Sequence, residues 1–165
     1  MKIIATILIF ALCQISLAWK AETHTDEMTD AKQFVVWTTG TVVRINSLVE
    51  YTPQLQVRMT SPTYLPDTDK IRAKFELLFT IETEGLKRSG AEVMYRVDDK
   101  EPITEIWSPA TDRHGAFSPH AVELIKELQT AQTLRIRYIT TLGDIRTVRF
   151  DVTGLKDALK KAIAK

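Results

Sequence analysis

The chain has 165 residues, with 22 lysines and arginines, 21 aspartates and glutamates and one cysteine. Because these charges almost balance, the composition argues against general nucleic-acid binding and against a polybasic membrane-binding surface. The cysteine, Cys13, lies in a segment that we expect to be removed, so the mature fold must depend on a hydrophobic core rather than on disulfides.

The first eighteen residues have the layout of a secretory signal peptide. Lys2 precedes an apolar run at 3–12, and a polar stretch follows that ends at Ala18, with small residues at positions −3 and −1 of a cut after it. The run is shorter than the roughly 20 apolar residues of a membrane-spanning helix. Bulky residues precede Cys13, which argues against a lipid anchor. We therefore expect cleavage after Ala18, no membrane span in the mature chain, and a periplasmic or secreted location.

The rest of the chain divides into a polar lead-in at 19–33 and a single β-rich domain at 34–165. The lead-in has no apolar periodicity, so we expect it to be flexible. The domain begins with FVVWTTGTVVRIN, which predicts two short strands broken near Gly40. In QLQVRMT apolar and polar residues alternate, as they do in a strand with one buried face.

The segment AEVMYRVDDKEPITEIW, residues 91–107, predicts a hairpin with its turn at DDKEP. Asp98 and Asp99 favour local backbone hydrogen bonds, and Pro102 cannot continue a central strand. An acidic metal or catalytic site is the alternative, but adjacent residues of a strand point to opposite faces. We expect an exposed turn, in which replacing both aspartates by asparagine changes stability by only about 0.5 kcal/mol.

Two helices are expected in the second half of the chain. In SPHAVELIKEL, Ser118 is the expected N-cap of an amphipathic helix. A closing helix has apolar residues at every fourth position: Leu155, Leu159 and Ile163. With the strand patterns, these segments predict a mainly β fold with two helices (α+β). We expect an antiparallel β-sandwich-like domain with one helix before the last hairpin and another at the C-terminus.

The last hairpin, LRIRYITTLGDIRTVRFDV, predicts both a core face and a charged face. A three-residue loop at 142–144 would place Arg137 opposite Arg149, and Arg135 opposite Asp151. Six residues would then share the buried face: Leu134, Ile136, Tyr138, Val148, Phe150 and Val152. The outer arginines either extend into water or meet acids on a neighbouring strand, or they form a patch that binds an acidic surface of a partner.

Aromatic residues on strands are commonly core residues, and we expect this of Trp37 and Tyr95. Trp107 differs, because its position next to Ile106 places it on the opposite face of the strand. An exposed tryptophan beside a loop would mark a binding surface. We therefore add Trp107 to Arg135, Arg137 and Arg149 as candidate partner-binding residues.

Few residues suggest catalysis or metal binding. Asp112, His114 and His120 have ligand chemistry, but their spacing matches no compact zinc motif. Ser118 stands near two histidines without a nucleophile-elbow sequence. We therefore expect no catalytic residue, no metal and no cofactor, and a hydrolase remains a third alternative that would need Ser118 to act with His114 or His120.

Four segments resemble the VasI-like family of proteins associated with bacterial type VI secretion. They are PQLQVRM at 53–59, VMYRVDDKEP at 93–102, FSPHAVELIKEL at 117–128 and FDVTGLKDALKKA at 150–162. The chain departs from the family pattern at Met59, where a cysteine would follow the arginine, and it has no cysteine at its end. The resemblance implies an accessory envelope protein with no assigned catalytic mechanism.

We accordingly expect a periplasmic, non-enzymatic accessory protein that binds an unidentified protein partner of the cell envelope and no nucleic acid. An alternative keeps the fold and changes the role to an envelope immunity or exclusion factor encoded by a phage or mobile element. Neighbouring genes discriminate between the two: secretion-apparatus genes favour the first role, and prophage or effector genes favour the second.

Overall fold

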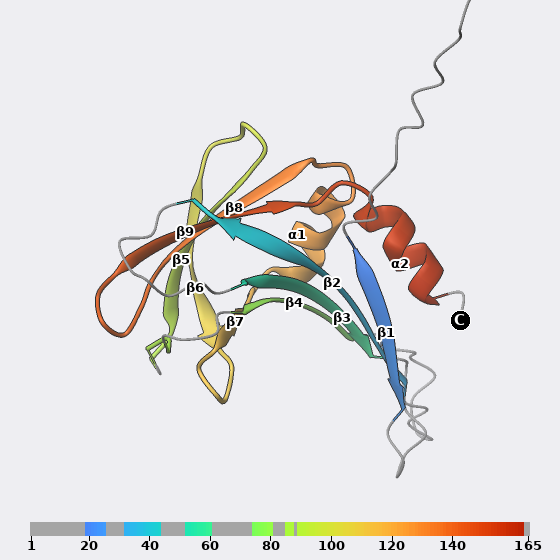
Figure 1. Ribbon diagram of the computed structural model, residues 1–165, viewed down its shortest axis with the longest axis horizontal. Helices are drawn as coiled ribbons and strands as arrows, with labels where there is room; N and C mark the ends of the chain where they lie inside the picture. The colour runs from blue at the N-terminus through green and yellow to red at the C-terminus, as the bar shows by residue number, and fades with distance from the viewer. Residues whose placement is uncertain are drawn as a thin grey trace, which may run out of the picture.

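The structure is a computed structural model that describes residues 19–25, 32–43, 52–60, 74–80, 85–87 and 89–163. Nine strands and two helices lie within this part of the chain (Figure 1). The strands are β1 (Lys20–Thr25), β2 (Lys32–Val42), β3 (Gln54–Thr60), β4 (Lys74–Thr80), β5 (Ala91–Val97), β6 (Ile103–Pro109), β7 (Gly115–Phe117), β8 (Thr133–Ile139) and β9 (Ile145–Asp151). The helices are α1 (Ala121–Leu128) and α2 (Leu155–Ile163).

The strands form a closed antiparallel barrel. Their order is β1-β2-β3-β4-β7-β6-β5-β8-β9, and β2 also pairs with β9, so eight strands close into a ring and β1 is an extra strand on β2. The expectation of a β-sandwich is therefore wrong. Sandwiches and barrels both bury alternate residues of each strand, so the same sequence pattern fits either architecture.

Strand β2 closes the ring because it is long enough to have different neighbours along its length. Its first part lies between β1 and β3, whereas Gly40–Val42 pairs with Val148–Phe150 of β9. A Cβ atom on Gly40 would lie only 2.6 Å from side-chain atoms of Val148 and Phe150. Glycine thus permits the close approach of β9. The predicted break at Gly40 is instead a continuous strand at the point of closure.

The barrel interior is filled with side chains from alternate strand positions. All six residues predicted for the inner face of the last hairpin are buried, which confirms that expectation. Aromatic rings occupy the middle of the core: the ring centroid of Phe79 lies 5.6 Å from that of Trp107 and 5.1 Å from that of Tyr138. A small barrel of this kind has a packed interior rather than a channel.

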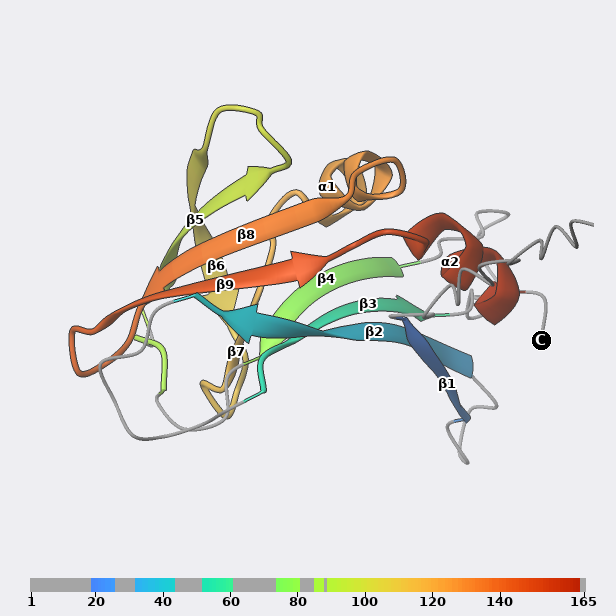
Figure 2. The same ribbon diagram turned by 45° about the horizontal axis from the view of Figure 1, so that its top comes forward.

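Both predicted helices are present, and they lie toward the end of the barrel that is remote from the β8–β9 turn (Figures 1 and 2). Helix α1 buries Leu124, Ile125 and Leu128. Its N-cap is His120, whereas the Oγ of Ser118 accepts a hydrogen bond from the backbone N–H of His120, so the predicted cap is wrong. Helix α2 packs against β1 and β2 and buries Leu155 and Leu159. The side chain of Ile163 lies outside the described residues.

The expectation of a flexible lead-in is also wrong over the residues that the structure describes. Residues 20–25 form β1, which pairs with β2 from Lys20 opposite Trp37 to Thr25 opposite Lys32. Trp19, directly before β1, has only 6% of its surface exposed and belongs to the core. All six side chains of β1 are exposed, so the segment has no apolar alternation by which a strand could be predicted.

Candidate functional site

The candidate site is an arginine surface on the outside of the barrel, formed by Arg96, Arg135, Arg137 and Arg149. Strand β8 lies between β5 and β9, with Arg135 opposite both Arg96 and Arg149. Residues that face each other across antiparallel strands have Cβ atoms about 5 Å apart. Arg96, Arg135 and Arg149 therefore form a row of neighbouring side chains across three strands. Arg137 lies two residues further along β8.

The observed register of the last hairpin differs from the predicted one by two residues. Arg135 faces Arg149, and Arg137 faces Thr147, so the predicted pairings of Arg137 with Arg149 and of Arg135 with Asp151 are wrong. The connection is a five-residue loop at 140–144. Because a shift of two residues preserves the face of every side chain, the three arginines still lie on the outside.

Backbone and side-chain hydrogen bonds explain why the loop is longer than predicted. The backbone N–H of Thr140 donates to the carbonyl oxygen of Asp144 (3.0 Å), and the backbone N–H of Asp144 donates to the Oγ1 of Thr140 (3.2 Å). Gly143 lies within this loop with φ 88°, a conformation that glycine adopts without strain. The Nη2 of Arg146 lies 3.2 Å from the Oδ2 of Asp144, and this contact also joins the loop to β9.

Mostly uncharged oxygens position the arginine side chains. The Nη1 of Arg135 donates to the carbonyl oxygen of Asp98 (2.8 Å), and the Nε of Arg137 donates to the Oγ1 of Thr147 (3.3 Å). The Nη2 of Arg96 donates to the carbonyl oxygen of Asp99 (3.0 Å) and lies 3.9 Å from its Oδ1. Because carbonyl and hydroxyl oxygens carry no net charge, these contacts orient the guanidinium groups while leaving most of their positive charge uncompensated.

A recess of ≈220 Å³ lies within the arginine surface. It is lined by Met94, Tyr95, Arg96, Pro102, Arg135, Arg137 and Thr147. The Nε of Arg96 is buried and has no hydrogen-bond partner in the described part of the chain. Arg96, Arg135 and Arg137 all line the recess, and hydrogen bonds from a guanidinium to an anion are strong. The recess is therefore a position at which a carboxylate or another anion would be stabilised.

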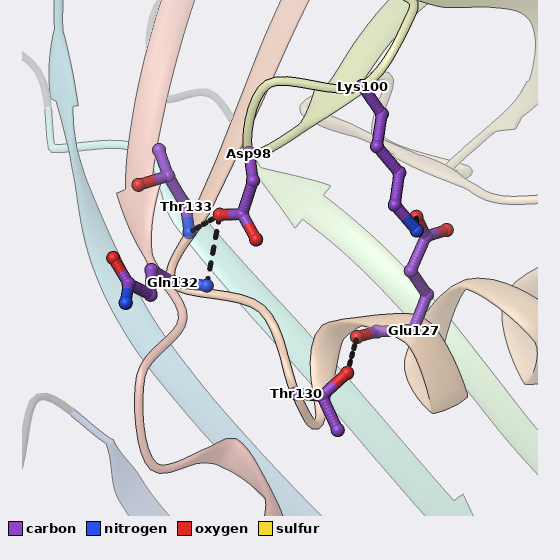
Figure 3. A network of polar contacts seen from close by, with 6 residues as sticks. All are labelled: Asp98, Lys100, Glu127, Thr130, Gln132 and Thr133. Atoms are coloured by element: carbon purple, nitrogen blue, oxygen red, sulfur yellow. Dashed lines mark hydrogen bonds and ion pairs between the residues drawn. The ribbon is translucent and has the colours of Figure 1, made fainter.

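Hydrogen bonds join the turn of the β5–β6 hairpin to the start of β8 (Figure 3). Asp98 has φ 49°, and its Oδ1 accepts hydrogen bonds from the backbone N–H groups of Gln132 (3.0 Å) and Thr133 (2.7 Å). The Nζ of Lys100 lies 2.8 Å from Oε1 of Glu127 on α1. The prediction of a turn is confirmed, but Asp98 is more than a solvated turn residue because it fixes the start of β8 beside Arg135.

Trp107 does not belong to this surface, so that sequence-based candidate is wrong. Its side chain is completely buried, and its ring centroid lies 6.0 Å from that of Tyr95. Its neighbour Ile106 is 60% exposed. The two residues do lie on opposite faces, as predicted, but the prediction assumed that Ile106 faced the core.

A polar cluster that the sequence analysis missed lies next to Trp107. Glu105 accepts hydrogen bonds from the Nε1 of Trp107 (3.2 Å) and from the hydroxyl of Tyr95 (3.4 Å). Burial raises the pKa of Tyr95 to about 12, and the negative charge of Glu105 acts in the same direction. The tyrosine is thus held in its protonated form as a hydrogen-bond donor. The carboxylate of Glu105 is the acceptor for the polar groups of two aromatic core residues. We assign this cluster a structural role.

The structure does not assemble the sequence candidates for metal binding or hydrolysis. Asp112 accepts a hydrogen bond from the backbone N–H of His114 (2.9 Å), whereas the Nε2 of His120 lies 4.0 Å from Oε1 of Glu105. Within the described ranges no group of three or more potential ligands could hold a metal ion. Ser118 is buried, and no hydrogen bond joins its hydroxyl to an imidazole in that part of the chain.

Arg96 is the one residue of the arginine surface that the sequence did not suggest as a candidate. It alternates with Val97 on β5 as an outward residue, but only the pairing of β5 with β8 brings it beside Arg135.

Comparison with protein-family models, curated proteins and solved structures finds no match to this chain. Among the described residues, no helix has the length and hydrophobicity needed to cross a membrane.

Proposed function

We propose that this protein is an exported, non-catalytic accessory protein of the bacterial envelope that binds a protein partner through the arginine surface. The observation that carries the proposal is the cross-strand row of Arg96, Arg135 and Arg149, with Arg137 beside it. The predicted signal peptide and the resemblance to VasI-like proteins support a location in the envelope and a role beside type VI secretion.

The electrostatics of the row favour an acidic partner. Like charges that face each other across a β-ladder are unfavourable, and here Arg135 has a like charge on both sides. Carboxylates of a partner would reduce this repulsion, and the planar guanidinium fork pairs with two carboxylate oxygens at once. Binding would therefore reduce the electrostatic repulsion between facing arginines as well as form new ion pairs.

Charge reversal at the two exposed residues of the arginine surface tests this proposal. Arg137 and Arg149 are exposed, and Arg149 forms no hydrogen bond or ion pair with another side chain in the described part of the chain. We expect the double variant R137E/R149E to lose partner capture from intact envelopes, as measured by affinity purification and mass spectrometry. Capture by the unaltered protein should weaken as salt is added. The melting temperature should hold or rise, because Arg135 loses a facing like charge.

The matched control is K156E/K160E, which makes the same change of charge at two exposed positions of α2. It should capture the same partner as the unaltered protein. Equal capture by R137E/R149E, with its fold intact, would remove the arginine surface as the binding site. Loss of capture in both double variants would show that total charge, not this surface, governs binding.

A further inference from the structure

A second recess, of ≈330 Å³, lies on the outer face of β1, β2 and β3, where the sequence analysis assigned no site. It is lined by Glu22, His24, Gln33, Val35, Trp37, Gln54, Gln56 and Arg58. The intervening residues Val36, Leu55 and Val57 are completely buried, so the recess and the core lie on opposite faces of the same strands. Trp37 therefore faces outward and is only partly buried, and the prediction that it is a core residue is wrong. Its volume is at the lower end of the roughly 300–1,000 Å³ that is usual for ligand sites.

The strand register arranges this polar surface in rows. Trp37 lies opposite Lys20 on one side and Gln56 on the other. One row further along, Val35 lies opposite Glu22 and Arg58. The partly buried ring of Trp37 on β2 therefore lies between two polar strands. Strand β1 carries ionisable side chains on one side, and β3 carries two amides and a guanidinium on the other.

Hydrogen bonds fix the direction in which the amides of β3 point. The Nε and Nη2 of Arg58 donate to the Oε1 of Gln56 (3.2 and 3.0 Å), and the Nε2 of Gln56 donates to the Oε1 of Gln54 (3.0 Å). Because a guanidinium can only donate, it sets the orientation of the first amide and, through it, that of the second. The amide nitrogen of Gln54 is thereby left to donate to a ligand, without first having to reorient.

Hydrogen-bond acceptors lie on the opposite side of the recess. The Oε2 of Glu22 lies 3.6 Å from the Nε2 of His24, and both side chains are more than half exposed. Between the two sides, the Nζ of Lys20 lies 4.5 Å from the ring centroid of Trp37. The cations Lys20 and Arg58 are thus accompanied by the carboxylate of Glu22. This mixture of charges does not favour a strongly charged ligand such as a nucleic acid or a polyphosphate.

We propose that the outer face of β1, β2 and β3 binds a neutral oligosaccharide. Sugar hydroxyls both donate and accept hydrogen bonds, so they match a surface with oriented donors on β3 and a carboxylate on β1. The apolar face of a sugar ring would pack against the ring of Trp37 in place of the flexible side chain of Lys20, whose Nζ lies over that ring. This site is separate from the arginine surface, and it does not depend on the proposed function.

Intrinsic fluorescence offers a direct test, because the chain has three tryptophans and two of them are buried. A change on ligand addition therefore reports on Trp37. The probes are soluble β-1,4-linked tetrasaccharides of glucose and of N-acetylglucosamine. We expect a saturable change with at least one of them. Trp37→Ala should weaken binding by about tenfold or more, because it removes an aromatic contact at the centre of the site. Calorimetry measures this difference in affinity.

Two further variants keep the test decisive if Trp37→Ala fails to fold. Trp37→Phe retains an aromatic ring and should bind within a few fold of the unaltered protein, whereas Gln54→Ala removes the oriented donor and should weaken binding. Arg149→Ala, on the arginine surface, is the control and should bind normally. No saturable signal with either sugar, unchanged binding by folded Trp37→Ala and Gln54→Ala, or binding of sulfated oligosaccharides alone would each overturn the proposal.

Discussion

At the scale of single residues, Asp98 and Asp99 are adjacent in the sequence and yet have different roles. Asp98 accepts two backbone hydrogen bonds from Gln132 and Thr133, residues 34 and 35 positions further along the chain. Asp99 is 96% exposed, and its carboxylate makes only a long contact with Arg96. Turn chemistry alone explains both residues, so the sequence predicts no difference between them.

Substitution should separate the two aspartates. We expect Asp98→Ala to lower the free energy of unfolding by about 1–3 kcal/mol, because two backbone N–H groups lose their acceptor. Asp99→Ala should change it by about 0.5 kcal/mol or less. Urea denaturation of both variants measures the difference. If Asp98→Ala is as stable as Asp99→Ala, the contact between the turn and β8 contributes nothing to stability.

At the scale of elements, helix α2 shows how a helix attaches to the barrel. Leu155 and Leu159 are buried, as are Ala158 and Ala162, so one face of α2 packs against β1 and β2. The lysines at 156, 160 and 161 are exposed on the other face. This division agrees with the sequence pattern of the closing segment and assigns it a partner that the pattern could not name.

Removing one of these contacts should destabilise the protein measurably. We expect Leu159→Ala to lower the free energy of unfolding by about 2–5 kcal/mol, the usual effect of deleting a buried leucine side chain. Lys160→Ala, one residue further along on the exposed face, is the control and should be close to neutral. Thermal and chemical unfolding give both values, and a neutral Leu159→Ala would mean that α2 does not pack on the barrel.

At the scale of the whole molecule, closure of the barrel depends on the contact between β2 and β9. In the described part of the chain, three register pairs join these strands, from Gly40 with Phe150 to Val42 with Val148, and the backbone N–H of Val43 donates to the carbonyl oxygen of Thr147 (2.9 Å). Closure also determines the surroundings of the arginine surface, because it places Thr41 opposite Arg149. The fold of the ring and the shape of the candidate site are therefore linked.

A methyl group at Gly40 tests this closure. We expect Gly40→Ala to lower the free energy of unfolding by about 1–3 kcal/mol, because its Cβ would overlap the side chains of Phe150 and Val148. Combining it with Phe150→Leu should give less destabilisation than the sum of the two single changes, as a double-mutant cycle in urea would measure. Strictly additive effects would indicate that Gly40 and Phe150 are not in contact.

The periodicity of apolar residues predicts which residues of most elements face inward. Alternation in the last hairpin predicts that Leu134, Ile136 and Phe150 lie in the core. The apolar residues at every fourth position of the closing segment predict that Leu155 and Leu159 share one face of a helix. These conclusions hold because the periods of strands and helices are local properties of the chain. They remain correct although the predicted register of the last hairpin is wrong by two residues, because such a shift leaves every side chain on its own face.

The neighbours of each strand, in contrast, are known only from the three-dimensional fold. Alternation cannot distinguish a barrel from a sandwich, because both bury one face of each strand and differ only in pairings between distant segments. For the same reason Arg96 could not be joined to Arg135, Trp107 could not be oriented without knowing the role of Ile106, and the polar residues of β1 gave no signal. The candidate surfaces depend on these non-local pairings, whereas the sequence pattern records only local burial.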